Sequence, residues 1–261
     1  MVDNVHHRYS ESTMTSSERR PETGGLVWFD APAPPRATEQ LSRERIVAAA
    51  MELADDQVPG EITMRALAAR LGVRSPMALY RYVGSKDGLV DLMTDQVYGQ
   101  ITVPRGDGWR AALQGLGRTS WDAVQRHLWF ARLAFSRPPM GPNALHLYDT
   151  ALAELEPLGL DAATRMGFVK TVLGHVLGSG LALLEEQTMR ARVGFHSDSD
   201  LDAAAAPYVE RIAAAGEHPY FIRWATDPQR LAPEPQSFEQ VLEWLLDGLA
   251  TLLPPEDRSP A

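Results

Sequence analysis

Residues 63–86, TMRALAARLGVRSPMALYRYVGSK, decide the fold of this chain. Thr63 is suited to cap a short helix, and Gly72 follows where that helix must end. Ser75 and Pro76 then start a second short helix. Ser is favoured at the cap of a helix, and Pro is favoured in the first turn because an N–H at that position would have no hydrogen-bond partner in the helix. Two short helices joined by a tight turn predict a helix-turn-helix.

The side chains of this stretch divide into an inner and an outer set. Ala68 is small where the two helices must cross, and Leu79 and Val83 are placed to enter a core. The outer set of the second helix is polar or aromatic and consists of Met77, Ala78, Tyr80, Arg81 and Tyr82. This division is typical of a recognition helix that enters a DNA groove.

The charge of the motif differs from the charge of the whole chain. The chain has 25 Lys and Arg against 34 Asp and Glu, a net charge of −9. Residues 62–86 contain no Asp or Glu and five basic residues, namely Arg65, Arg70, Arg74, Arg81 and Lys86. A local basic patch in an acidic chain indicates a phosphate backbone as partner. The alternative is a plain helical hairpin with a solvated basic face.

Composition excludes several classes of protein. The 261 residues contain no cysteine, so disulfides, thiolate metal sites and thiol catalysis are excluded. The net negative charge excludes a protein that coats polyanions over its whole surface. No apolar run approaches the roughly 18 residues of a membrane helix, and no secretion signal is visible at the start. We therefore expect a soluble cytoplasmic protein without a membrane partner.

Three regions follow from the composition along the chain. Residues 1–40 are polar and proline-rich and predict a disordered or partly docked arm, in which the apolar patch 26–29 is the candidate for docking. Residues 41–103 form the helix-turn-helix domain, and residues 104–261 form a larger helical domain.

Helical periodicity predicts an all-α protein. Ser42 caps a first helix that Pro59-Gly60 ends, and Ser85 caps a helix over 86–101. Further helices are predicted over 108–126, 127–135, 143–156, 161–190 and 237–253, with a weaker one near 205–215. The stretches 191–204 and 227–236 are predicted to be loops, and no alternating strand pattern is present.

The stretch 46–93 resembles the N-terminal domain of TetR-type transcriptional repressors. It contains Leu79-Tyr80-Arg81-Tyr82-Val83 where that family has its L-Y-x-[HY]-[FV] recognition segment, followed by a lysine that opens the next helix. The segments SRPPMGPNALHLYDTALAEL and GHVLGSGLALLEEQ resemble the tetracycline-repressor-like C-terminal domain of the family. The resemblance covers about residues 42–253.

This resemblance implies an Ω-shaped, all-helical homodimer whose two recognition helices read a palindromic operator in double-stranded DNA. By position, Arg65 would reach a phosphate or a base, and Tyr80 and Lys86 would clamp phosphate. The remaining candidates for DNA contact are Arg74, Ser75, Met77, Ala78, Arg81 and Tyr82. Tyr80 as a core residue, and Arg70 and Arg74 as solvated side chains, remain alternatives. The turn is one residue longer than in the tetracycline repressor, so base contacts can shift by one position.

The C-terminal domain carries the residue types of a small-molecule pocket. The candidates are His127, Trp129, Phe130, Met140, His146, Tyr148, Met166 and His175, with Phe168 nearby in sequence. The alternative is that most of them form the core. Leu133 lies where the tetracycline repressors have a metal-binding histidine, so we expect an apolar or aromatic effector and neither a metal nor a cofactor.

Two apolar stripes are candidates for a dimer interface rather than intramolecular core. The first consists of Phe168, Val172, His175, Val176, Ser179 and Leu183, with Gly174, Gly178 and Gly180 allowing close approach. The second consists of Phe238, Val241, Leu242, Leu245, Leu249 and Leu252. Together they would form a four-helix interface with a second copy.

The sequence disfavours two other functions. An enzyme is not expected, because no HExxH motif, phosphate loop or nucleophile triad is present, and Asp198, Asp200 and Asp202 lack the rest of a calcium-loop pattern. A helical protein that binds small molecules but not specific DNA would have a neutral or acidic second helix, which the basic segment contradicts.

Overall fold

A computed structural model describes residues 27–29, 41–56, 62–227 and 238–253. Within these ranges the chain forms helices and no strand, which confirms the all-α prediction. The N-terminal part contains a short 3-10 turn and four helices: η1 (Val27–Phe29), α1 (Arg43–Asp56), α2 (Met64–Arg70), α3 (Met77–Val83) and α4 (Lys86–Tyr98). The C-terminal part contains α5 (Gly108–Arg126), α6 (Leu128–Ser136), α7 (Pro142–Leu155), η2 (Glu156–Leu158), α8 (Ala162–Val193), α9 (Asp198–Ala215), α10 (Pro219–Ala225) and α11 (Phe238–Ala250).

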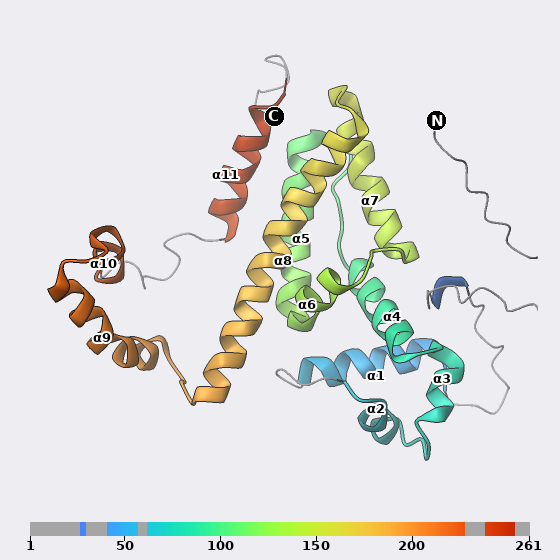
Figure 1. The fold of residues 1–261 in the computed structure, drawn as a ribbon. Helices are drawn as coiled ribbons and strands as arrows, with labels where there is room; N and C mark the ends of the chain where they lie inside the picture. Colours follow the sequence, from blue (N-terminus) through green and yellow to red (C-terminus); the bar gives the residue numbers. More distant parts are fainter. Residues whose placement is uncertain (1–26, 30–40, 57–61, 228–237, 254–261) are drawn as a thin grey trace, which may run out of the picture.

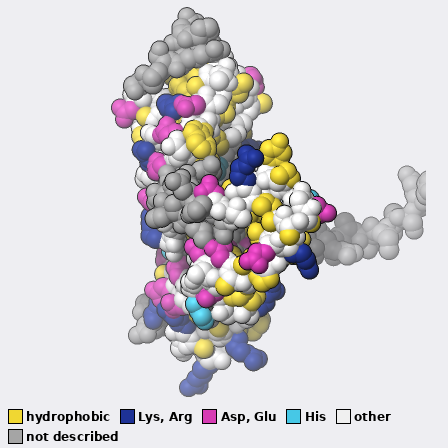
Figure 2. Space-filling model, turned by 90° about the vertical axis from the view of Figure 1, so that its left-hand side faces the viewer, with side chains coloured by type: hydrophobic (Ala, Val, Ile, Leu, Met, Phe, Trp, Pro, Cys, Tyr) yellow, Lys and Arg dark blue, Asp and Glu magenta, His cyan; other side chains and the backbone are white. Residues whose placement is uncertain are grey.

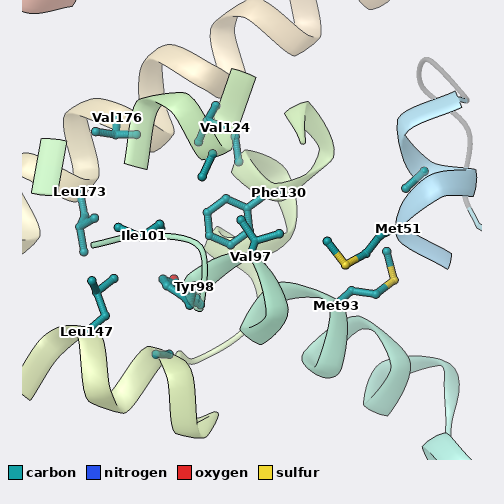
Figure 3. Packing of buried hydrophobic residues seen from close by; sticks show 14 of the residues in the cluster. Met51, Met93, Val97, Tyr98, Ile101, Val124, Phe130, Leu147, Leu173 and Val176 are labelled. Atoms are coloured by element: carbon teal, nitrogen blue, oxygen red, sulfur yellow. The ribbon is translucent and has the colours of Figure 1, made fainter. Parts of the chain in front are cut away.

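One hydrophobic core runs through both parts of the chain. The helices α5, α6, α7, α8 and α11 pack side by side, and α4 reaches from α1 and α3 to α6 and α7 (Figure 1). Figure 3 shows the junction, where Met51 of α1 and Met93 of α4 point toward one another. Phe130 of α6 lies against Tyr98 of α4 with ring centroids 5.1 Å apart. The two parts are therefore joined by packing as well as by the chain.

Glycines allow α5 to approach its neighbours closely. A Cβ on Gly180 of α8 would lie 2.3 Å from Val124 Cγ1, and a Cβ on Gly117 of α5 would lie 2.7 Å from Leu242 Cδ2 of α11. A side chain on Gly180 would force the stiff Val124 or its helix to shift, whereas at Gly117 the flexible end of Leu242 can move aside. Gly180 thus serves the subunit core, which corrects the expectation that it lies in a dimer interface.

The first predicted dimer stripe is also largely core. Phe168, Val172 and Val176 are 0–2% exposed and pack within the subunit, because α8 turns this face toward α5 and α6. The outward side of α8 carries Gly167, Thr171, Gly174 and Gly178 instead. Added Cβ atoms on its three glycines would meet no atom within 4 Å.

The second stripe is divided in the same way. Leu242 of α11 is fully buried in the subunit, and Val241, Leu245 and Leu249 are partly buried. Leu252, just beyond α11, is 62% exposed, and Trp244 of α11, which was not expected, is 51% exposed. The side of α11 that is available to a partner therefore differs from the predicted one.

The segment around α9 differs from the prediction. Residues 191–204 were expected to form a loop, but α8 continues to Val193 and α9 begins at Asp198. Ser197 accepts a hydrogen bond from Asp200 N, and the Asp200 carboxylate accepts one from Ser197 N, which is a capping box. The three aspartates thus belong to the start of a helix, where acidic side chains favour the helix dipole. The second predicted loop, 227–236, lies outside the described residues except for its first position.

The helices α9 and α10 form a hairpin that stands apart from the body of the molecule (Figure 1). They contact each other, and none of their residues is buried. Large side chains on this hairpin are more than half exposed, namely Tyr208, Tyr220, Phe221 and Trp224. An apolar surface of this kind is typical of a contact with another molecule.

In the part of the chain that the structure describes, one helix, α8, is long and apolar enough to cross a membrane by length and composition, contrary to the expectation that no segment approaches this limit. It packs more extensively against α5 and α6 than against any other helix. Its apolar character is therefore explained by its place in the core.

Candidate nucleic-acid interface and its connection to the effector domain

The helix-turn-helix is built by local hydrogen bonds. Thr63 Oγ1 accepts a hydrogen bond from Ala66 N at 3.1 Å and starts α2. Gly72, with φ +68°, turns the chain after α2, and Val73 N donates to Ala68 O at 2.9 Å. A positive φ favours glycine, because a Cβ would be strained there. Ser75 Oγ accepts from Met77 N at 3.3 Å, where α3 begins.

The inner and outer sets of side chains are separated largely as predicted. Leu79 and Val83 are fully buried, and Ala68 is 3% exposed where the helices cross. The surface of the motif has exposed Arg65, Arg74, Ser75, Met77, Arg81 and Lys86 and half-buried Ala78 and Tyr80. Lys and Arg side chains gather at the lower end of the molecule, where α2 and α3 lie (Figure 2).

Tyr82 is an exception and corrects the prediction that it faces a groove. Its side chain is 6% exposed and belongs to the core, because it follows Leu79 by three positions on the inner face of α3. Its carbonyl oxygen accepts a hydrogen bond from Arg43 Nε at 2.9 Å, which ties the start of α1 to the end of α3.

Arg70 does not face outward as a free cation. It donates to Glu52 at 2.9 Å and to Asp56 at 3.0 Å, both on α1. Of the five basic residues in the segment, this one has its charge compensated by α1. The other four basic residues of the segment, Arg65, Arg74, Arg81 and Lys86, are exposed.

Helix α4 connects the motif to the C-terminal part through two buried carboxylates. Asp91 is 4% exposed and accepts two hydrogen bonds from Arg137, at 2.6 and 2.8 Å. Asp95 is 5% exposed and accepts hydrogen bonds from Ala144 N at 2.9 Å and Asn143 N at 3.3 Å, at the start of α7. Burial raises the pKa of Asp95, and these hydrogen bonds act in the opposite direction.

Sequence reasoning missed this pair of carboxylates, although a signal was present. Both occur at helical spacing on the face of α4 that also carries the buried Thr94 and Tyr98, roughly opposite to Leu89, Met93 and Val97. Charged residues on a buried face are expected to have a specific partner. The loop between α6 and α7 supplies the partner of Asp91, and the first turn of α7 supplies that of Asp95.

His127 and Trp129, which the sequence assigns to a pocket, form a second connection between the two parts. Trp129 Nε1 donates to Asp55 Oδ1 at 2.6 Å, and His127 Nδ1 lies 2.9 Å from the same oxygen. His127 Nε2 lies 3.2 Å from Gln100 Nε2. Asp55 is near the end of α1, so this cluster links the helix-turn-helix domain to the start of α6.

The other predicted pocket residues do not converge on one site. Phe130 is 1% exposed in the junction core, and Tyr148 and Met166 are half-buried at separate places on α7 and α8. The His175 ring stacks on Phe238 at 5.0 Å, and its buried Nε2 has no hydrogen-bond partner among the described residues. Burial lowers the pKa of His175, an effect opposed by a hydrogen bond with the backbone of Phe238.

Met140 and His146 line two different hollows beside α4. Met140 lines a narrow crevice that also involves Trp28, Asp91, Thr94, Asp95, Tyr98, Pro138, Pro139, Gly141 and Ala144. His146 lines a pocket of about 270 Å³ between α7 and the chain that follows α4. The other residues of this pocket are Tyr98, Gly99, Ile101, Thr102, Val103, Arg105, Asn143, Leu147 and Thr150.

The larger pocket combines an apolar wall with polar groups. Arg105 Nη2 donates to Thr150 Oγ1 at 2.9 Å, and Tyr98 and Leu147 supply apolar surface. Within the described ranges no three His, Asp or Glu side chains are grouped as metal ligands. The pocket is thus suited to an organic molecule with an acidic or hydrogen-bonding edge.

Two family models match the chain over most of its length. Residues 46–93 match the model described as "Bacterial regulatory proteins, tetR family", and residues 103–253 match "Tetracyclin repressor-like, C-terminal domain". The chain belongs to the tetR family. Members of this family are transcriptional regulators and not enzymes, which confirms both expectations.

Individual proteins agree with the family assignment. HTH-type transcriptional repressor DrrR1 of Streptomyces coeruleorubidus is 33% identical over 232 residues, which cover 87% of this chain and 84% of the relative. Tetracycline repressor protein class A from transposon 1721 of Escherichia coli is 28% identical over 215 residues, which cover 81% of this chain and 91% of the relative.

The fold of this tetR-family chain is shared with solved structures. The tetR-family protein ActR of Streptomyces coelicolor in complex with (S)-DNPA aligns with a TM-score of 0.68 and 23% identity. The alignment covers 83% of this chain and all of that chain. This likeness concerns the fold alone.

Proposed function

We propose that this chain is a cytoplasmic, dimeric repressor that binds a two-fold symmetric DNA operator and is released by a small aromatic effector. The observation that carries the proposal is the helix-turn-helix, whose exposed surface carries basic side chains and which α4 joins to the effector domain. Two relatives support it, since both are repressors and one is a tetracycline repressor. A helical ligand-binding protein without specific DNA contact is the alternative, and the basic surface disfavours it.

Base reading is assigned to the exposed residues of α3, and phosphate binding to the residues around it. Arg81, Met77 and Ala78 face the base edges in the major groove. The backbone contacts come from Arg65, Arg74, Ser75, Tyr80 and Lys86. Lys86 lies in the first turn of α4, where the helix dipole also favours an anion.

Binding to DNA from upstream of the protein's own gene tests these assignments by fluorescence anisotropy. Lys86→Ala weakens binding to all DNA sequences alike and lowers the salt dependence of the affinity by about one phosphate contact. Arg81→Ala relaxes discrimination at one base position by about 1–3 kcal/mol. Arg192→Ala, an exposed arginine at the far end of α8, is the matched control. If neither Lys86→Ala nor Arg81→Ala differs from this control, the DNA-binding assignment is wrong.

The dimer is assigned to the outward faces of α8 and α11. Gly174 and Gly178 leave open space above α8, and Trp244 and Leu252 expose apolar surface along α11. These two helices contact each other, so their outward faces can join in one interface. Sedimentation tests the assignment: Gly178→Arg is expected to give monomers, and a variant that remains dimeric would refute it.

The effector is assigned to the pocket beside α4. Asn143 lines this pocket and also holds Asp95 of α4, so a molecule in the pocket can bias the position of α4. Arg105 at the edge favours an aromatic compound with an anionic or phenolic oxygen. This proposal adds an acidic group to the apolar or aromatic effector expected from the sequence.

The fluorescent aromatic anion 1-anilinonaphthalene-8-sulfonate serves as a probe of this pocket. Arg105→Ala should weaken its binding about tenfold, since a charge-assisted hydrogen bond contributes about 1.5–3 kcal/mol. Arg192→Ala is again the control, and Mg²⁺ should have no effect. Equal binding by Arg105→Ala and the control would exclude this pocket.

A further inference from the structure

The short turn Val27–Phe29 is attached to α4 although it lies far from it in sequence. Val27 is 4% exposed, and its Cβ lies 3.3 Å from the position that a Cβ on Gly88 would take. Gly88, in the first turn of α4, therefore lies against the turn Val27–Phe29, although the atom nearest to such a Cβ is Val83 O at 2.2 Å. Docking of this patch was one of the alternatives for the N-terminal arm, and the structure places it on the domain.

Trp28 extends this contact to the loop between α6 and α7. The half-buried indole lines the same crevice as Thr94 and Tyr98 of α4 and residues 138–141 of the loop. The turn therefore contacts α4 and shares a crevice with the loop on the other side of the joint that positions the helix-turn-helix domain.

The crevice under Trp28 contains the polar connections of that joint. Asp91, which Arg137 binds, and Asp95, which holds the start of α7, both line it. An ion pair becomes stronger as water is excluded from it, because the effective dielectric constant falls. By covering these carboxylates, Trp28 strengthens the attachment of α4 to the loop.

The turn lies outside the parts of the chain that match the family models. Those matches begin at residue 46, so Val27 and Trp28 precede them. The α4 joint thus receives a contact from a segment that is additional to the two family domains.

We infer that the turn Val27–Phe29 is an intramolecular strap that restrains α4 against the α6–α7 loop and so sets how readily the DNA-binding domain moves. A strap that restricts α4 lowers the conformational freedom that the free protein loses on binding DNA. Loss of the strap should weaken operator binding and loosen α4 without unfolding the rest of the chain. This inference rests on the proposed function for its DNA readout only.

Hydrogen exchange of the full-length protein, followed by mass spectrometry, tests the strap directly. In Trp28→Ala, amides of α4 and of residues 138–144 should exchange at least about threefold faster, whereas those in the centre of α5 remain unchanged. Trp28→Phe, which retains an aromatic ring, should exchange nearly as the wild type does. Trp224→Ala is the matched control, because this indole on α10 is 58% exposed.

Operator affinity of the same variants gives the second readout. Trp28→Ala should bind DNA at least about threefold more weakly than wild type and Trp224→Ala. Unchanged exchange in α4 would overturn the strap. Faster exchange with unchanged affinity would leave a structural contact only and overturn its regulatory role. A wild type that binds no DNA would refute the proposed function, and the exchange result would still decide whether the strap restrains α4.

Discussion

Removing the Arg137 guanidinium is expected to destabilise the protein more than removing any comparable surface arginine. Asp91 is 4% exposed and Arg137 is 23% exposed, so Arg137→Met leaves a carboxylate buried without its partner. Loss of one member of a fully buried ion pair costs about 3–5 kcal/mol. Because water reaches part of Arg137, we expect about 2–3 kcal/mol, which corresponds to a fall in Tm of about 4–12 °C for a chain of this size.

The exposed pair Arg118–Glu239 provides the matched control. Its side chains are 49% and 48% exposed, and Arg118 Nε lies 2.8 Å from a Glu239 oxygen. Exposed pairs contribute about 0–1 kcal/mol, so Arg118→Met should have a much smaller effect. Urea unfolding at pH 7, followed by circular dichroism, measures both free energies of unfolding.

A double-mutant cycle separates the ion pair from other effects of the substitution. Asp91→Leu combined with Arg137→Met removes both charges, so no charge remains buried alone, and a coupling energy of about 2 kcal/mol is expected. If Arg137→Met costs no more than Arg118→Met, or if the coupling energy is zero, the reasoning about the joint is wrong.

Three further substitutions test other parts of the structure. Burial lowers the pKa of His175 below 6.5, so the unfolded chain binds a proton before the folded chain does as the pH falls, and the free energy of unfolding should decrease below about pH 6.5. The decrease between pH 7.5 and pH 5.5 should be smaller in His175→Phe than in the wild type. An identical decrease in both proteins would contradict this prediction. Gly180→Ala should destabilise by about 1–3 kcal/mol because its Cβ would meet Val124, whereas Gly167→Ala, also on α8, has open space and should raise stability slightly; equal changes in Tm would refute the packing argument. Asp55→Ala removes the acceptor shared by His127 and Trp129 and should cost about 1–2 kcal/mol with faster amide exchange at the start of α6; unchanged exchange there would show that this contact does not hold the domains.

The helix-turn-helix was predictable because its signals are local. Caps at Thr63 and Ser85, the turn at Gly72 and the alternation of buried and exposed positions act within a few residues. Tyr82 was misassigned because an aromatic residue beside Arg81 fits either face, and only the packing of α3 against α1 decides between them.

The C-terminal part was less predictable because its contacts join distant segments. The side of α8 that faces the core depends on where α5 and α6 lie, so the glycines of α8 could not be divided between core and surface from sequence. His127 and Trp129 carry residue types common in pockets, but their shared partner Asp55 is more than 70 residues away. The start of α9 was recognisable in principle, since Ser197 and Asp200 have capping-box spacing.

Because α8 is long, a small tilt of this helix displaces its far end by several ångströms. Its 32 residues span about 48 Å, and its last buried residue is Leu184, so the final turns extend beyond the packed body with the α9–α10 hairpin attached. A tilt of about 5° along such a rod displaces its far end by about 4 Å. A rearrangement too small to resolve among the packed side chains of α5 and α8 would therefore become a visible movement of the hairpin. A fluorophore placed on α10 would report it, and a single introduced cysteine suffices for labelling because the chain has none of its own.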